Sequence, residues 1–253
     1  MPKASQISDK EYTDFAVMIG ANIRTLPPEV VAYYLDSKHR AEIPGALVNG
    51  FQLPDEAEES VIKQLGTVFR WTRGMIDLYK KYMEIDITPD LLNFIRTDQR
   101  IEFNWSVYRP QGLTARKAID LLCKPQFKVE EHINVADYSL ERDSNESHLV
   151  LCRETVEPDA EWHGKSANDM QATTTPFLDL CDRAVLEAIY YFVHKKHLDI
   201  KGVTRCPRSR CGDGAAYAGW NPRYRGFDVD AGAGDLPYPD FGGREAMVLP
   251  RKS

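Results

Sequence analysis

The sequence predicts an α+β protein in which helices fill the first hundred residues and a mixed domain follows. Before residue 100, apolar residues recur every three or four positions, the period of one helix face. From Ile101 onward, apolar and polar residues alternate, as in a half-buried strand. The segment Gly212–Gly243 holds eight of the chain's 16 glycines. We therefore divide the chain into a helical docking or oligomerisation part, 1–100, and an α+β part, 101–253.

The helical part contains three periodic segments, at 8–26, 29–40 and 55–82. Gly66 and Gly74 interrupt the third segment, which leaves a kink or a division into two helices open. A fourth helix is expected over 91–100, because Thr88, Pro89 and Asp90 combine a capping hydroxyl with proline at the first helical position. These helices predict a packed bundle.

The α+β part begins with strands predicted at 101–107, 127–140 and 148–155, with a short helix at 114–123. Residues 157–172 have the composition of a loop. Thr175 and Pro176 open a helix with a broad apolar face, which ends near His197. Residues 245–249 form a short apolar run that predicts a closing strand.

Composition and charge exclude several classes of function. The formal net charge of −6 argues against a general binder of nucleic acid or anionic membranes, since both need clustered positive charge. No stretch approaches the ~18 apolar residues of a membrane span, and the N-terminus lacks a secretory pattern. Five cysteines, an odd number, suit a reducing compartment. We therefore expect a soluble, cytoplasmic protein, with display on a virion or cell surface left open.

The glycine-rich segment Gly212–Gly243 is the strongest functional signal. It combines small residues and aspartates with aromatic side chains, a composition that antibody-like binding surfaces use, and two arginines stand in its middle. We expect an ordered, loop-rich surface here, and turns whose aromatics fill the core are the alternative. The expected ligand contacts are Tyr217, Trp220, Arg223, Tyr224, Arg225, Phe227, Asp228, Asp230 and Tyr238.

A second hypothesis concerns metals. His194, His197, Cys206 and Cys211 offer two imidazoles and two thiolates, the ligands of a tetrahedral zinc site, so a metalloprotein or cysteine-dependent enzyme is the alternative function. Helix-end histidines and free cysteines explain the same residues without a metal.

The sequence contains only incomplete motifs for a calcium site or for catalysis. Asp228, Asp230 and Asp235 resemble part of a calcium loop, but the donors required further along that loop are absent. The chain also lacks a nucleophile elbow and a phosphate-binding glycine loop, which favours a non-enzymatic protein.

The C-terminal fifty residues resemble the variable region of target proteins of diversity-generating retroelements. The likeness lies in Gly219-Trp220-Asn221, in the Tyr/Asp/Gly/Ala-rich middle, and in Phe241-Gly242-Gly243-Arg244 before an apolar run. The resemblance implies a C-type-lectin-like fold, related to formylglycine-generating enzymes, whose diversified surface faces a macromolecular ligand, and we expect that ligand to be a protein. It also implies an oxidase alternative, because the related enzymes use a cysteine pair near Cys206 and Cys211. Homo-oligomerisation through the N-terminal helices would add avidity.

Overall fold

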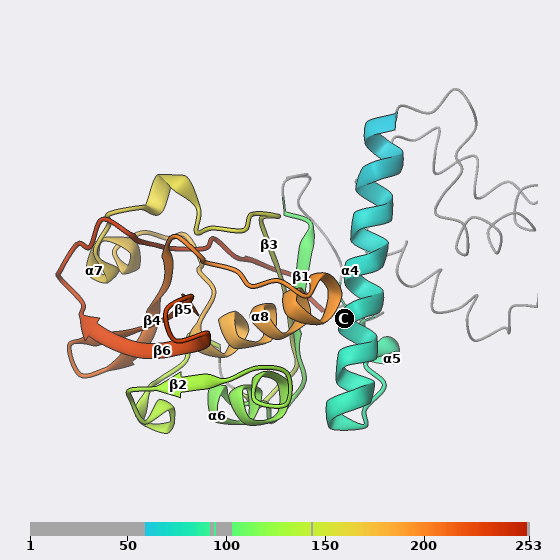
Figure 1. The fold of residues 1–253 in the computed structure, drawn as a ribbon, viewed down its shortest axis with the longest axis horizontal. Coiled ribbons are helices and arrows are strands. Elements are labelled where there is room, and N and C mark those ends of the chain that lie inside the picture. The colour runs from blue at the N-terminus through green and yellow to red at the C-terminus, as the bar shows by residue number, and fades with distance from the viewer. Residues whose placement is uncertain (1–58, 92–93, 95–102, 143, 252–253) are drawn as a thin grey trace, which may run out of the picture.

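The protein is described from a computed structural model, which places residues 59–91, 94, 103–142 and 144–251 (Figure 1) and, within 59–69, the helical backbone alone. The helices expected at 8–26 and 29–40 lie outside these residues. The described part is a mixed α+β structure, as predicted. None of its helices is long and apolar enough to cross a membrane.

The strands form two sheets. Their bounds are β1 (Trp105–Arg109), β2 (Val129–Glu131), β3 (His148–Cys152), β4 (Val203–Cys211), β5 (Gly214–Asn221), β6 (Gly226–Ala233), β7 (Phe241–Gly242) and β8 (Met247–Val248). The smaller sheet has the order β1-β3-β8 and is antiparallel. The larger has the order β2-β6-β5-β4-β7, in which both edge strands run parallel to their neighbours.

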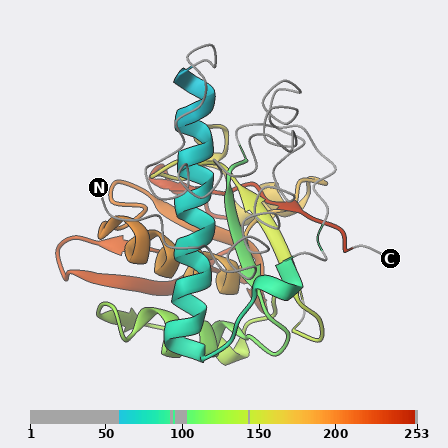
Figure 2. The same ribbon diagram turned by 90° about the vertical axis from the view of Figure 1, so that its right-hand side faces the viewer.

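The helices surround and separate these sheets. They are α4 (Glu59–Met83), α5 (Thr88–Leu91), α6 (Ala115–Ala118), α7 (Ala167–Gln171) and α8 (Leu180–His194), with a π-helix η2 (Ile119–Cys123) and the 3-10 turns η3 (Val135–Asp137) and η4 (Ala160–Trp162). Helix α8 occupies the centre and contacts strands of both sheets (Figure 1). Helix α4 runs across the outside, in front of the other elements in Figure 2.

Helix α8 begins later than the sequence indicated. Asp179 is its N-cap and forms a capping box with Asp182, so the helix starts at Leu180 and not at Pro176. Phe177 lies before the cap in an isolated bridge with Glu245. The sequence pattern placed the start of the helix too early because Phe177 and Leu178 are apolar and buried, although the backbone there is not helical.

Helix α4 confirms the long periodic segment and forms one helix across Gly66 and Gly74. Its described side chains pack into the same core as the α+β part: Trp71 stacks on Trp105, with ring centroids 4.7 Å apart. Gly74 lies where α4 crosses α8, and a Cβ added there would overlap Val193 Cγ2. The glycine therefore allows a close helix contact.

Other predicted boundaries change. Helix α5 spans only Thr88–Leu91, and of the residues expected to continue it, Phe94 bridges to Arg251 in extended pairing. The predicted loop 157–172 contains η4 and the capped helix α7. The strand predicted over 127–140 is limited to β2. Strand β3 and the helix capped by Thr114 agree with the prediction.

The largest correction concerns the glycine-rich segment. It was expected to be loop-rich, but β5 and β6 pair over eight residues each in an antiparallel hairpin, and β7 follows. Small residues allow this arrangement, because Ala216 and Ala218 are fully buried against the helical layer. The closing strand predicted at 245–249 is present as β8, which pairs with β3.

Buried ion pairs join the layers. Asp199 is fully buried and pairs with Arg183 of α8 at 2.9 Å and with Arg244 at 2.5 Å. Arg244 also donates hydrogen bonds to the carbonyls of Thr155 and Val156. These contacts join three parts of the chain: the segment after α8, which contains Asp199, helix α8 itself, and the C-terminal segment, which contains Arg244.

Candidate binding pocket

The candidate site lies on the face of the five-stranded sheet that points away from α8. Side chains alternate along β5 and β6, so Ala218 and Val229 point into the core, whereas Tyr217 and Asp228 lie on the opposite face. The register places Tyr217 opposite Asp230, and Gly219 opposite Asp228. This outer face therefore displays aromatic and acidic side chains around a glycine.

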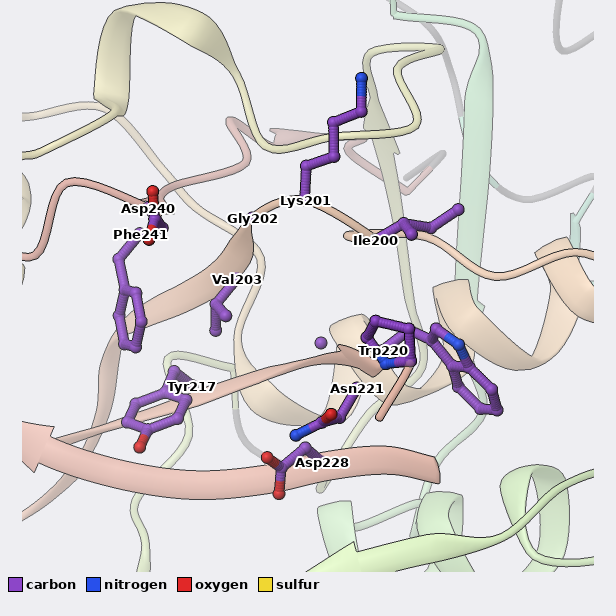
Figure 3. Close-up of a pocket in the computed structure, with 12 residues that line it drawn as sticks. Ile200, Lys201, Gly202, Val203, Tyr217, Trp220, Asn221, Asp228, Asp240 and Phe241 are labelled. Atoms are coloured by element: carbon purple, nitrogen blue, oxygen red, sulfur yellow. The ribbon is translucent and has the colours of Figure 1, made fainter. Parts of the chain in front are cut away.

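A pocket of about 260 Å³ opens on this face (Figure 3). Its residues come from the ends of β4, β5 and β7, from β6, and from the segment before β4. Gly202 and Gly219 line it without side chains. A Cβ at Gly219 would lie 3.4 Å from both Asp199 Cβ and the carbonyl oxygen of Gly202, so the segment before β4 packs closely over this position.

Aromatic residues lie at both ends of the pocket, although the indole of Trp220 is turned toward the core face and away from Tyr217 and Phe241 (Figure 3). Tyr217 and Phe241 pack edge to face at one end, with centroids 4.7 Å apart. Tyr217 donates a hydrogen bond to Asp230 Oδ2 at 3.0 Å, and burial together with this bond raises the pKa of the phenol. Tyr217 is thus a neutral, oriented side chain.

Trp220 lies at the other end and is held by stacking. Its indole is parallel to the imidazole of His197, with centroids 3.3 Å apart, and Tyr191 stacks on the same imidazole at 4.8 Å. His197 Nδ1 lies 2.8 Å from Glu187 Oε1, a fully buried carboxylate. This stack of rings fixes the orientation of the Trp220 indole in the unbound protein.

A buried cation supports the Tyr217 end. The guanidinium of Arg205 lies 5.0 Å from the ring centre of Phe241 and 5.4 Å from that of Tyr238, and it donates to Leu236 O at 3.0 Å. It has no carboxylate partner within the described part of the chain, and burial lowers its pKa. The loop between β6 and β7 is therefore anchored across the edge of the site.

Two carboxylates line the pocket. Asp228 Oδ1 is shielded from solvent and accepts no well-aligned hydrogen bond from the residues described, although His132 Nε2 lies 3.0 Å away. Asp240 is exposed and forms no ion pair with any residue of the described chain. Lys201 also lines the pocket, but its side chain extends away from the other labelled side chains in Figure 3.

The hairpin tip between β5 and β6 projects beside the pocket. Tyr224 is 56% exposed, and the guanidinium of Arg223 lies 5.6 Å from its ring centre. Arg225 adopts a left-handed conformation with φ of 51°. Tyr224, Arg223 and Arg225 are therefore accessible, as expected for ligand contacts.

The nine expected contact residues do not form one surface. The pocket contains Tyr217, Trp220 and Asp228, and the tip supplies the three residues of 223–225. Tyr238 is exposed at the edge of the site. The prediction that Phe227 contacts the ligand is wrong, because its side chain is fully buried and packs edge to face on Phe127.

The hypothetical zinc site is not formed. His194 packs against Tyr190, and His197 stacks on Trp220. Cys206 is fully buried, whereas Cys211 is exposed beyond a β-bulge in the same strand. No group of three or more metal-binding side chains exists among the residues that the structure describes.

The aspartates of the hypothetical calcium loop also have other roles. Asp228 and Asp230 stand on strand β6 and not in a loop, and Asp230 accepts the hydrogen bond of Tyr217. Asp235 lies beyond that strand in an exposed turn. The spacing of the three residues therefore comes from a strand and the turn after it.

Sequence patterns missed the other pocket residues. Gly202 and Ile200 follow the helix by a few residues and carry no motif, Asp240 appeared only as part of a composition, and Phe241 appeared in the resemblance but not as a ligand contact. Gly219 was singled out in the resemblance, within Gly219-Trp220-Asn221, and strand alternation places it on the same face as Tyr217 and Asn221. No family model, curated protein or solved structure matches this chain.

Proposed function

We propose that this chain is a non-enzymatic binding protein whose outer sheet face, with the adjoining hairpin tip, contacts a protein ligand. The observation that carries the proposal is the pocket itself: an open hollow on a sheet face, bounded by oriented aromatic rings and carboxylates. Rigid aromatic side chains supply contact area at low entropic cost, because they have few rotatable bonds.

The hairpin tip extends this surface. Tyr and Arg are enriched among residues that dominate binding energy. The exposed tip holds Tyr224 between two arginines, next to a pocket that contains a tryptophan. A protein ligand is large enough to contact both features together.

We further propose that the fold is C-type-lectin-like and that the surface is diversified, as the resemblance to retroelement target proteins implies. The position of the C-terminal apolar run supports this: Ala246 and Leu249 are buried, and β8 completes the small sheet. A reverse transcriptase gene and a near-copy of the 3′ coding sequence beside the gene are the expected genomic signs. A neighbourhood with neither would count against diversification, without affecting ligand binding.

Selection of peptides from a random displayed library on the immobilised full chain tests the binding function. We expect enriched peptides whose affinity falls about tenfold, equivalent to ~1.4 kcal/mol, in Tyr224→Ala and in Gly219→Val, which adds a branched side chain to the pocket wall. The matched control is Leu121→Ala, since Leu121 is 39% exposed but belongs to η2 and not to the sheet.

Unchanged melting temperatures would show that these variants fold. The proposal fails if no peptide is enriched, or if the enriched peptides bind both surface variants as tightly as the parent chain.

A further inference from the structure

We infer that the pocket receives the guanidinium of an arginine side chain from the ligand. This inference rests on the proposed function, since it names the group that the same site recognises. It follows from the shape of the pocket, its aromatic ends and its charge.

The shape suits a slender side chain that enters from outside. The pocket has a volume of about 260 Å³, and its walls are held by different elements: Tyr217 packs on Phe241 of β7, while Trp220 is held by the helix end through His197. The pocket is therefore present in the unbound protein, so binding loses little conformational entropy in the pocket residues.

The aromatic ends favour a flat cation. Guanidinium groups stack on aromatic faces and retain their charge at every physiological pH. Arginine already makes such contacts in this sheet, as Arg205 does with Phe241 and Tyr238. A ligand arginine would meet the rings of Tyr217 and Phe241 from the open side.

The charge of the pocket also favours a cation. Asp228 and Asp240 line it, and Lys201, the one basic side chain of the lining, extends away from the other labelled residues (Figure 3). Asp228 Oδ1 is shielded from solvent, and its contact with His132 Nε2 at 3.0 Å is not a well-aligned hydrogen bond. A guanidinium offers five N–H donors in a planar fork that matches a carboxylate, whereas an anionic ligand would meet two like charges.

Titration of the full chain with short peptides tests the inference. The probes are acetyl-Gly-Arg-Gly-amide, its citrulline analogue, which keeps the shape but lacks the charge, and the corresponding glutamate peptide. We expect saturable calorimetric binding of the arginine peptide and a shift of one indole N–H signal in NMR spectra. The citrulline and glutamate peptides should bind at least about tenfold more weakly.

Two variants locate the binding. Asp228→Asn keeps the shape and removes a charge, and it should weaken the arginine peptide about tenfold, whereas Gly219→Val should abolish binding. Leu121→Ala serves as the control outside the binding surface, because Leu121 is exposed on η2, and it should leave the affinity for this short peptide unchanged.

Equal binding of the citrulline peptide, an unaltered affinity in Asp228→Asn, or no saturable binding of the arginine peptide would each overturn the inference. The proposed function fails separately. If library-selected peptides depend on Gly219 and Tyr224 but bind without arginine, then the surface binds a ligand and only its arginine specificity is wrong.

Discussion

Trp220 belongs to the core and to the binding pocket at once. One face of its indole stacks on His197, and its ring lies 6.2 Å from Phe127 in an edge contact, yet the residue also lines the hollow. Truncating it would remove core packing as well as ligand contact. Tyr224, which is exposed at the hairpin tip, separates the two effects and is therefore the better residue for testing ligand contact.

His194 makes stability depend on pH. Burial, with help from Arg70 and Lys196, lowers the pKa of its imidazole below 6.5. Between the lowered folded pKa and 6.5, the unfolded chain binds more protons than the folded chain, so stability falls as the pH drops below 6.5. We expect His194→Gln to lose less stability than the parent chain when the pH falls from about 7.5 to about 5, since glutamine does not titrate.

Urea unfolding at the two pH values measures this difference. The same variant at the higher pH is the reference, because it separates the packing change from protonation. An identical pH dependence in the parent chain and in His194→Gln would contradict the assignment.

The contact of α4 with α8 depends on a missing side chain. In an exposed helix, changing Gly to Ala stabilises by ~1 kcal/mol. At Gly74 the added methyl would overlap Val193 Cγ2, so we expect Gly74→Ala to destabilise by about 1–3 kcal/mol through overpacking.

The double variant Gly74→Ala with Val193→Ala tests the cause. Removing the valine methyl groups makes room for the new Cβ, so the double variant should be more stable than the sum of the two single changes predicts. Additive losses in denaturant unfolding would show that the two side chains do not meet.

The β5–β6 hairpin shows why glycine and alanine do not always indicate loops. Propensity scales disfavour both residues in strands, but the register pairs β5 with β6 over eight positions, and the buried alanines lie against the helical layer. Packing and backbone pairing outweigh propensity here. On the opposite face, Gly219 lets the segment before β4 pack closely over the hairpin.

The stability of the whole fold includes a contribution from the buried ion network around Asp199. Arg183 and Arg244 both pair with its carboxylate, and although burial raises the pKa of Asp199, these two arginines lower it overall. We expect Asp199→Ala to cost about 3–5 kcal/mol, because it leaves buried guanidinium groups without their partner. The stabilisation by the ionised carboxylate is present above pH 3.8, the unfolded value, and is lost as the pH falls through the lower folded pKa.

Denaturant unfolding at neutral pH measures this loss, and Asp240→Ala is its control, since Asp240 is exposed. If both aspartate variants had the same stability, the network would have no structural role.

The sequence by itself determined those features that local periodicity and composition encode. The mixed α+β class, the helical segment of α4, the strand β3 and the closing strand β8 follow from patterns within a few residues, whereas the continuity of α4 across Gly66 and Gly74 does not. The sequence also indicated Tyr217, Trp220 and Asp228 as ligand contacts, because the composition of Gly212–Gly243 is unusual for a core. All three residues line the pocket.

Only the tertiary structure decided which of these side chains meet. Phe227 and Asp228 are neighbours in the chain, but strand alternation buries the first and exposes the second to the pocket. His197 contacts Trp220 and not the cysteines, because the end of α8 meets β5 there. Such contacts join residues far apart in the chain, and no local pattern specifies them, since their energy comes from packing that exists only in the folded state.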